Sequence, residues 1–535
     1  MAPDPSEEQE AAEAPKPTSS VARSRPWSAV RRAGRRAWDW LGRVSGDRIQ
    51  RPYAKTILAH QVPRDAEENL ELTPPADSHL AVEGIWAFEA FTPSNIEGAL
   101  KQMRKKGWAQ QHRRGAERSL VAWLSSVRKE GGRGNHNVWF NRPADGRYST
   151  VSHHADLPDF AASAVGEMVA LTPSISGLAV FFVLKPQGRG EIEAALRANY
   201  VSHVRSKGDF FTTIDPRAAR MEAINAIRRR WRAQIAAWFE AHAPGVFCEG
   251  NAGGLPTCEL LIGDNFPLFE RGDEAMSKIS EVAGAVFSHW IFEQEDTEDA
   301  VMFAPHPVHL EDLGTHAILA ASRQRLEGSV HRLNKGAGED RFILGADEDF
   351  RESFTRWALL DVVNVYAQRV NQARDQAARL FSSPFPLRVL KRLQRLTTIL
   401  GDTATLTREL KTFAEQDMRA RRSGYDLVIR RFRAKETRWV LQNWVQENLK
   451  GRIEALASAS GELDTFIAAQ GNLTNARANL ELQVIVFVFA IIGLVFGAVS
   501  GFEAGYTLWK DSKEAAIKKA AASDLPITVI INTPK

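Results

Sequence analysis

The sequence predicts an α+β cytosolic domain followed by an all-α helical stalk or bundle and one C-terminal transmembrane helix. Three observations predict this fold class. Residues 83–340 alternate strand-like and helix-like patches without a regular βαβ period, which favours α+β over a doubly wound fold. Residues 341–482 contain little Gly or Pro and have helical periodicity. Residues 484–502 form a run of nineteen residues without a charge.

The composition excludes several classes of protein. The chain has 535 residues and a mean hydropathy of −0.29, which excludes a polytopic transporter because its apolar spans would raise that average. Two cysteines exclude a disulfide-built secreted scaffold and a multi-cysteine zinc or iron–sulfur site. The net charge of +4 is uninformative as a total, because the charges are unevenly placed along the chain.

The first 82 residues divide into three parts. Residues 1–20 predict a disordered acidic tail, residues 21–52 a basic amphipathic segment, and residues 53–82 a linker. We interpret the basic segment as a helix that lies on a membrane surface and binds anionic lipid. A nucleic-acid arm and a docked helix with a solvated arginine face are the alternatives. The residues expected at the membrane surface are Arg31, Arg32, Arg35, Arg36, Trp38 and Trp40.

Several elements can be assigned within residues 83–340. The run from Leu178 to Lys185 predicts a buried strand. A long helix is expected to begin at Pro216 and to stop before the Pro-Gly pair at 244–245. A helix predicted over His316–Leu333 closes the domain, and a glycine-containing turn follows it.

The stalk over residues 341–482 is predicted to contain three or four long helices. Leucines recur on one helix face, which is typical of a bundle core. They are Leu387, Leu390, Leu393, Leu396 and Leu400.

Residues 483–508 are predicted to form the transmembrane helix, because about 20 apolar residues span a bilayer core. A fully buried helix is the alternative. Four glycines at every fourth position share one helix face, which favours close helix–helix packing and a homo-oligomer. They are Gly493, Gly497, Gly501 and Gly505.

The predicted location is the cytoplasmic (inner) membrane, with the main domain facing the cytoplasm. The lysine-rich flank after the span favours a cytoplasmic C-terminus. The chain before the span shows no signal peptide, and this argument, to which we give more weight, favours a cytoplasmic main domain. Residues 509–535 are predicted to be a charged tail that ends in a short strand-like segment, and the topology of this tail stays open.

No sequence motif of a known catalytic or phosphate-binding site occurs in the chain. The best polar constellation contains residue types that bind divalent metal or act in acid–base catalysis. It comprises His306, His309, Asp312 and His316. Ordinary surface or capping residues are the alternative, and the sequence implies no cofactor.

Basic residues gather in two further clusters, at 101–118 and 217–232, with tryptophans nearby. Stacking aromatic rings and cations can bind nucleotides or single strands. Charged helix faces above packed tryptophans are the alternative.

The preferred function is that of a non-enzymatic, membrane-anchored, self-assembling sensor, binding or channel-like protein, in which the stalk couples the α+β domain to the span. The first alternative is a membrane-tethered enzyme that uses His306, His309 and Asp312, either with a bound metal or by acid–base catalysis alone. The second is a nucleotide or nucleic-acid binder that uses the basic clusters.

Overall fold

The computed structural model describes most of the chain between residues 56 and 522. The described ranges are 56, 58–109, 119–140, 152–153, 155–207, 210–249, 254–266, 279, 282–283, 291–294, 301–305, 316–330, 341–380, 386–416, 427–429 and 440–522.

A mixed ten-stranded sheet forms the centre of the α+β domain, in the order β12-β9-β10-β11-β8-β1-β5-β4-β2-β3. The pairs β11–β8 and β2–β3 are parallel and the other pairs are antiparallel. The strands are β1 His79–Phe91, β2 Gly134–Phe140, β3 Ser152–His153, β4 Ala161–Ala170, β5 Ser176–Leu184, β8 Thr257–Asp264, β9 Phe292–Gln294, β10 Met302–Ala304, β11 His316–Ala321 and β12 Leu427–Ile429. A separate hairpin pairs β6 His203–Lys207 with β7 Phe210–Ile214.

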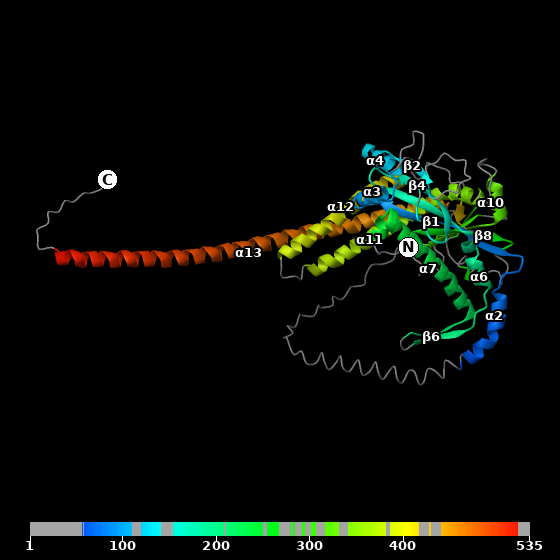
Figure 1. Cartoon of the computed structure of the whole chain (residues 1–535), viewed down its shortest axis with the longest axis horizontal. Helices are drawn as coiled ribbons and strands as arrows, with labels where there is room; N and C mark the ends of the chain where they lie inside the picture. The colour runs from blue at the N-terminus through cyan, green and yellow to red at the C-terminus, as the bar shows by residue number, and fades with distance from the viewer. Residues whose placement is uncertain are drawn as a thin grey trace, which may run out of the picture.

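Helices surround the sheet and continue into a projecting stalk (Figure 1). They are the 3₁₀ helix η1 Val62–Arg64 and the α-helices α2 Asp65–Glu71, α3 Ile96–Lys105, α4 Leu120–Glu130, α5 Pro186–Arg189, α6 Glu191–Arg197, α7 Pro216–His242, α8 Val246–Glu249, α10 Arg323–Val330, α11 Arg341–Leu380, α12 Pro386–Gln416 and α13 Leu441–Ala522. The α+β architecture expected from the sequence is confirmed.

Strand β5 is buried along its whole length, as its unbroken apolar run predicts. It pairs with β1 in antiparallel register, which places Gly84 of β1 opposite Val183. The ring of Phe181 occupies the space where a Cβ atom of Gly84 would lie, 2.1 Å from the nearest ring carbon. A glycine is therefore required where this aromatic ring crosses the neighbouring strand.

The two faces of the sheet are covered by different long helices. On one face, Trp238 of α7 packs edge-on against Phe182 of β5, with ring centroids 5.2 Å apart. On the other, the Trp86 indole of β1 donates a hydrogen bond of 2.8 Å to Asp347 of α11. The core therefore lies in two layers, one between α7 and the sheet and one between the sheet and α11.

Helix α7 begins where its sequence predicts. The Asp215 carboxylate caps it by accepting a hydrogen bond of 2.7 Å from the Ala218 amide, and Pro216 occupies the first turn. The helix ends at His242, two residues before Pro244, which cannot donate a backbone hydrogen bond.

The helix predicted over His316–Leu333 is wrong in its first part. Residues His316–Ala321 form β11, which pairs with β8 in parallel, and the helix α10 starts only at Arg323. All six residues of β11 are buried. A strand that is covered on both faces has no polar–apolar alternation, so its short apolar run resembles a helix turn in sequence.

The predicted transmembrane helix over 483–508 is also wrong. Among the described residues, no helix combines the length and the apolarity that a membrane crossing requires. The predicted inner-membrane location, with the main domain facing the cytoplasm, therefore has no support.

Candidate functional site: the uncovered part of α13

Helix α13 starts inside the helical bundle and then leaves it. Its first part packs against α11 and α12. The residues of α13 buried there include Leu449, Leu456, Leu463 and Ile467. Beyond them α13 extends far past the ends of α11 and α12 (Figure 1).

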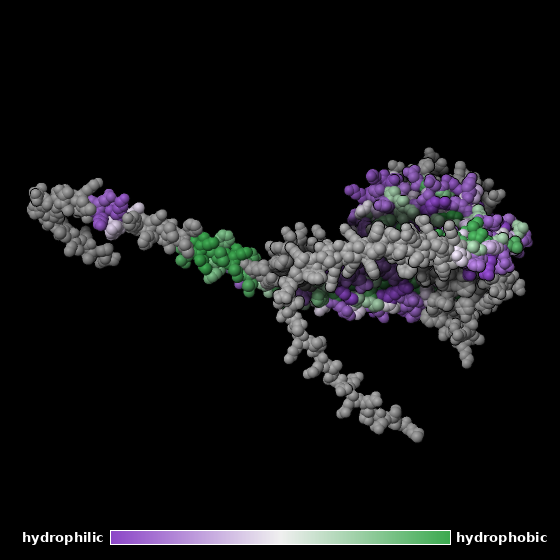
Figure 2. Space-filling view, turned by 90° about the horizontal axis from the view of Figure 1, so that it is seen from below, coloured by the Kyte–Doolittle hydropathy of each residue, from purple (hydrophilic) through white to green (hydrophobic). Residues whose placement is uncertain are grey.

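The projecting part carries the largest concentration of exposed apolar side chains in the described chain. Eleven large apolar side chains between Leu480 and Leu494 are 43–74% exposed. We call this stretch the apolar segment. Figure 2 shows it as the green length of the projecting helix, whereas the coloured atoms of the globular part are mostly purple, with a smaller green patch at its far end.

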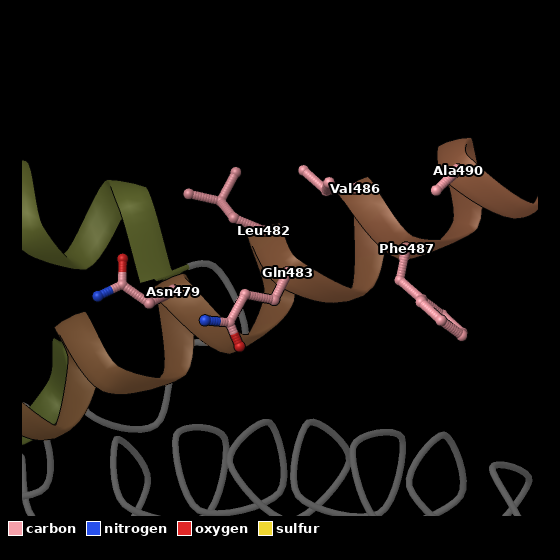
Figure 3. Close-up of a pocket in the computed structure, with 6 residues that line it drawn as sticks. All are labelled: Asn479, Leu482, Gln483, Val486, Phe487 and Ala490. Atoms are coloured by element: carbon pink, nitrogen blue, oxygen red, sulfur yellow. The ribbon is translucent and has the colours of Figure 1, made fainter. Parts of the chain in front are cut away.

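Apolar side chains leave the segment on every side. Successive residues of an α-helix point about 100° apart, so Val484, Ile485, Val486 and Phe487 point in four directions. All four are about half exposed or more. Figure 3 shows Leu482 and Val486 on one side of the helix and Phe487 on the other. No face of the segment is therefore covered by the described part of this chain.

The glycine face predicted from the sequence lies on the same helix. An added Cβ atom at Gly493 would meet no other atom within 4 Å, so this position is open to an approaching helix. The surroundings of Gly497, Gly501 and Gly505 lie outside the described side chains.

Two carboxylates of α12 join the stalk to the α+β domain. Asp402 accepts hydrogen bonds from the hydroxyls of Tyr366 (2.5 Å) and Ser94 (2.9 Å). Two turns further along, Glu409 accepts hydrogen bonds from the Ser174 hydroxyl (2.6 Å) and the Ser174 amide (3.0 Å). Because residues seven apart share a helix face, α12 is held against the domain at two points of one face. The helices from which α13 emerges are thus fixed to the domain.

A buried carboxyl group lies close to this junction. Glu89 of β1 accepts backbone hydrogen bonds of 2.9 Å from Phe247 and 3.1 Å from Cys248. Burial raises the pKa of Glu89 to about 7. Burial, with Glu89 nearby, also raises the pKa of the Cys248 thiol. A thiol that stays protonated is a poor nucleophile, so this pair organises the turn at α8.

Of the predicted polar constellation, the structure describes only His316. This residue begins β11 and is 2% exposed. Its Nε2 lies 3.2 Å from Glu259 Oε2 and its Nδ1 lies 2.8 Å from Thr257 Oγ1. Arg228 of α7 donates to both oxygens of Glu259, with Nε at 2.9 Å from Oε2.

Burial lowers the pKa of His316 to about 4. Burial alone would raise the pKa of Glu259, but Arg228 and the hydrogen bond from His316 hold it at about 2. At neutral pH a neutral imidazole thus lies beside an ionised, paired carboxylate in the core. This arrangement ties α7 to β8 and β11 and presents no group to solvent.

The other members of the constellation, His306, His309 and Asp312, lie outside the described residues. Within the described ranges, no three His, Cys, Asp or Glu side chains are grouped so that they could hold a metal ion. The residues expected at a membrane surface, Arg31 to Trp40, also lie outside the described chain.

The basic cluster on α7 does not form one surface patch. Arg220 and Arg228 are buried and bind the Ala198 carbonyl and Glu259 respectively. Arg230 is paired with Glu191. Several of the arginines expected to face a nucleic acid therefore serve the packing of α7.

Sequence reasoning missed Leu480 and Leu482 at the start of the apolar segment. Both stand among polar residues before the uncharged run, so a search for an uninterrupted run cannot include them. Their spacing from later apolar residues along the helix is the signal that finds them.

No known protein family, curated protein or solved structure matches the chain. The function must therefore be inferred from the geometry of the chain itself.

Proposed function

We propose that this protein is an assembly protein that associates with further copies of itself through the apolar segment of α13. The α+β domain is carried at one end of the helical stalk, and the segment lies beyond the bundle on the same helix. The exposure of eleven large apolar side chains on one length of helix is the observation that carries this proposal.

The exposed area is large enough for a stable interface. Eleven such side chains, each about half exposed, present on the order of 1,000 Å² of apolar surface. The largest apolar patch on a monomeric protein is usually about 300–600 Å², and a standard interface buries roughly 800 Å² per partner. Burial of this surface against another copy removes it from water, which favours association.

The rest of the described chain has no comparable surface that could cover the segment. Outside α13, the large exposed apolar side chains of the described residues are Val62, Leu70 and Val201. Val62 and Leu70 belong to η1 and α2, and Val201 lies between α6 and β6. Helices α2 and α6 lie far from the projecting end of α13 (Figure 1). Within the described ranges no other surface covers the segment, and association between chains would cover it.

The test compares the full-length chain with a variant of the segment by size-exclusion chromatography coupled to light scattering. Phe487→Lys combined with Leu494→Lys places two charges on one helix face, seven residues apart. The wild-type chain is expected to have a mass above that of the 59.5 kDa monomer, and the variant is expected to shift toward the monomer.

Leu70→Lys is the matched control, because Leu70 is 78% exposed but stands on α2. Its mass is expected to equal that of the wild type. A wild-type chain that is monomeric, or a control that dissociates as far as the segment variant, would overturn the proposal. Far-UV circular dichroism confirms that each variant is folded.

A further inference from the structure

A row of exposed Leu and Phe side chains recurs every seven residues along α13. The members, which we call the heptad row, are Leu473, Leu480, Phe487, Leu494 and Leu508, with Gly501 at the remaining position. The five large side chains are 62–74% exposed. The row begins before the apolar segment and continues beyond it, so the apolarity of the segment does not account for it.

The heptad row does not continue the line of leucines by which α13 packs in its own bundle. That line is marked by Leu449, Leu456 and Leu463, which are also seven apart but buried against the bundle. The next two positions at the same seven-residue spacing after Leu463 are Gln470 and Arg477, which are polar. The heptad row starts ten residues after Leu463, which is not a multiple of seven, and therefore follows another line on the helix.

A seven-residue spacing has a specific physical meaning. A straight α-helix has 3.6 residues per turn, so residues seven apart drift around it by about 20° per heptad. They form one continuous line only when the helix supercoils with another helix at 3.5 residues per turn. Leu side chains on such a line act as knobs that fill holes on the partner helix.

The partner must offer an apolar row of equal length. From Leu473 to Leu508 the row covers about 52 Å of helix. Outside α13, the described residues expose only single large apolar side chains, so no other described element of this chain matches it. The same row on a second copy has the same length and spacing, as an interface between identical copies requires.

We infer that the heptad row is the seam of a coiled coil between α13 helices of separate copies. This inference rests on the proposed self-association and specifies which face of α13 makes it. The seam extends over the whole row, beyond the apolar segment at both ends.

Two phenylalanines provide a matched pair of variants. Phe487 is on the row and is 65% exposed, whereas Phe489 is off the row and is 68% exposed. Glutamate is a good helix former, so Phe487→Glu and Phe489→Glu both leave the helix intact. Sedimentation equilibrium of the full chain is expected to show that Phe487→Glu raises the dissociation constant by about tenfold or more, and Phe489→Glu by about threefold or less.

A second pair tests the length of the seam. Leu473→Glu and Leu508→Glu lie on the row but outside the apolar segment, and each is expected to weaken association by about tenfold. Asn472→Glu, next to the row, is expected to leave it unchanged.

The outcomes separate the two proposals. Equal effects of Phe487→Glu and Phe489→Glu, or no effect of Leu473→Glu and Leu508→Glu, would overturn the seam while self-association through the segment remains. A wild-type chain that stays monomeric would overturn both.

Discussion

The Tyr366 hydroxyl of α11 donates a hydrogen bond to Asp402 of α12 at an O···O distance of 2.5 Å. The same hydroxyl lies 3.0 Å from Thr92 Oγ1, at the end of β1. Burial, together with the Asp402 carboxylate, raises the pKa of Tyr366, so the phenol keeps its proton and remains a donor. Two stalk helices and the central sheet thus meet at one hydrogen-bonded point.

Asp402→Ala is expected to lower the free energy of unfolding by about 2–3 kcal/mol, because it leaves the Tyr366 and Ser94 hydroxyls without their charged acceptor. Urea denaturation measures the change. Asp375→Ala, an exposed position on α11, is the control and is expected to change stability by less than about 0.5 kcal/mol. Equal stability of Asp402→Ala and wild type would show that this junction does not hold the stalk.

Asp361 of α11 should make the protein less stable as the pH rises from about 4 to 7. Burial raises the pKa of this carboxyl to about 7, although Arg452, Asn364 and Arg232 oppose the rise. Because the pKa is higher in the folded state than in the unfolded chain, the folded protein holds the proton over this range and the unfolded chain does not. The protonated Asp361 carboxyl therefore stabilises the folded state fully below about pH 4. This stabilisation is lost as the pH rises through about 7.

Asp361→Asn removes this titration and should flatten the pH dependence of the free energy of unfolding, measured by urea denaturation at pH 5, 7 and 8. The variant is expected to be more stable than wild type at pH 8 by a few kcal/mol, since it carries no buried charge there. Glu89 titrates with the same sign, so part of the dependence remains. An unchanged pH profile would refute the assignment to Asp361.

Arg228→Met is expected to cost about 3–5 kcal/mol of stability, because it leaves the Glu259 carboxylate buried without its cation. Its neighbour Arg229 is exposed, so Arg229→Met should change stability by less than about 0.5 kcal/mol. Thermal and urea unfolding of both variants measure the difference. If the two variants were equally stable, the buried pair would not be what ties α7 to the sheet.

Gly84→Ala is expected to destabilise the fold by about 1–3 kcal/mol, because the new Cβ atom would lie 2.1 Å from the Phe181 ring. Gly98 of α3 has no atom within 4 Å of such a Cβ, so Gly98→Ala should stabilise the protein by about 0.5–1 kcal/mol. Differential scanning calorimetry should therefore show shifts of opposite sign. A fall in melting temperature for both variants would contradict the stated packing.

The elements that the sequence predicts correctly are those whose signals are local. Helix α7 has a capping Asp215, a proline in its first turn and a proline just past its end. Strand β11 has no such signal, because its alternation disappears when both faces are buried. Its identity as a strand depends on β8, which is more than fifty residues earlier in the chain.

The sequence also predicts the candidate site only in part, because some of its features depend on contacts between distant parts of the chain. The uncharged run and Gly493 locate the uncovered part of α13, but the run predicts a membrane span, which the structure does not support. The buried pair Arg228–Glu259 joins residues 31 positions apart and arises only when α7 packs on β8. No spacing rule in the sequence links these two side chains.

Sedimentation equilibrium of the full-length wild-type chain over a concentration series tests the central claim most directly. If the apolar segment of α13 mediates self-association, the mass should rise with concentration from 59.5 kDa toward a whole-number multiple of that value. A mass of 59.5 kDa at every concentration, in protein shown to be folded, would contradict the account.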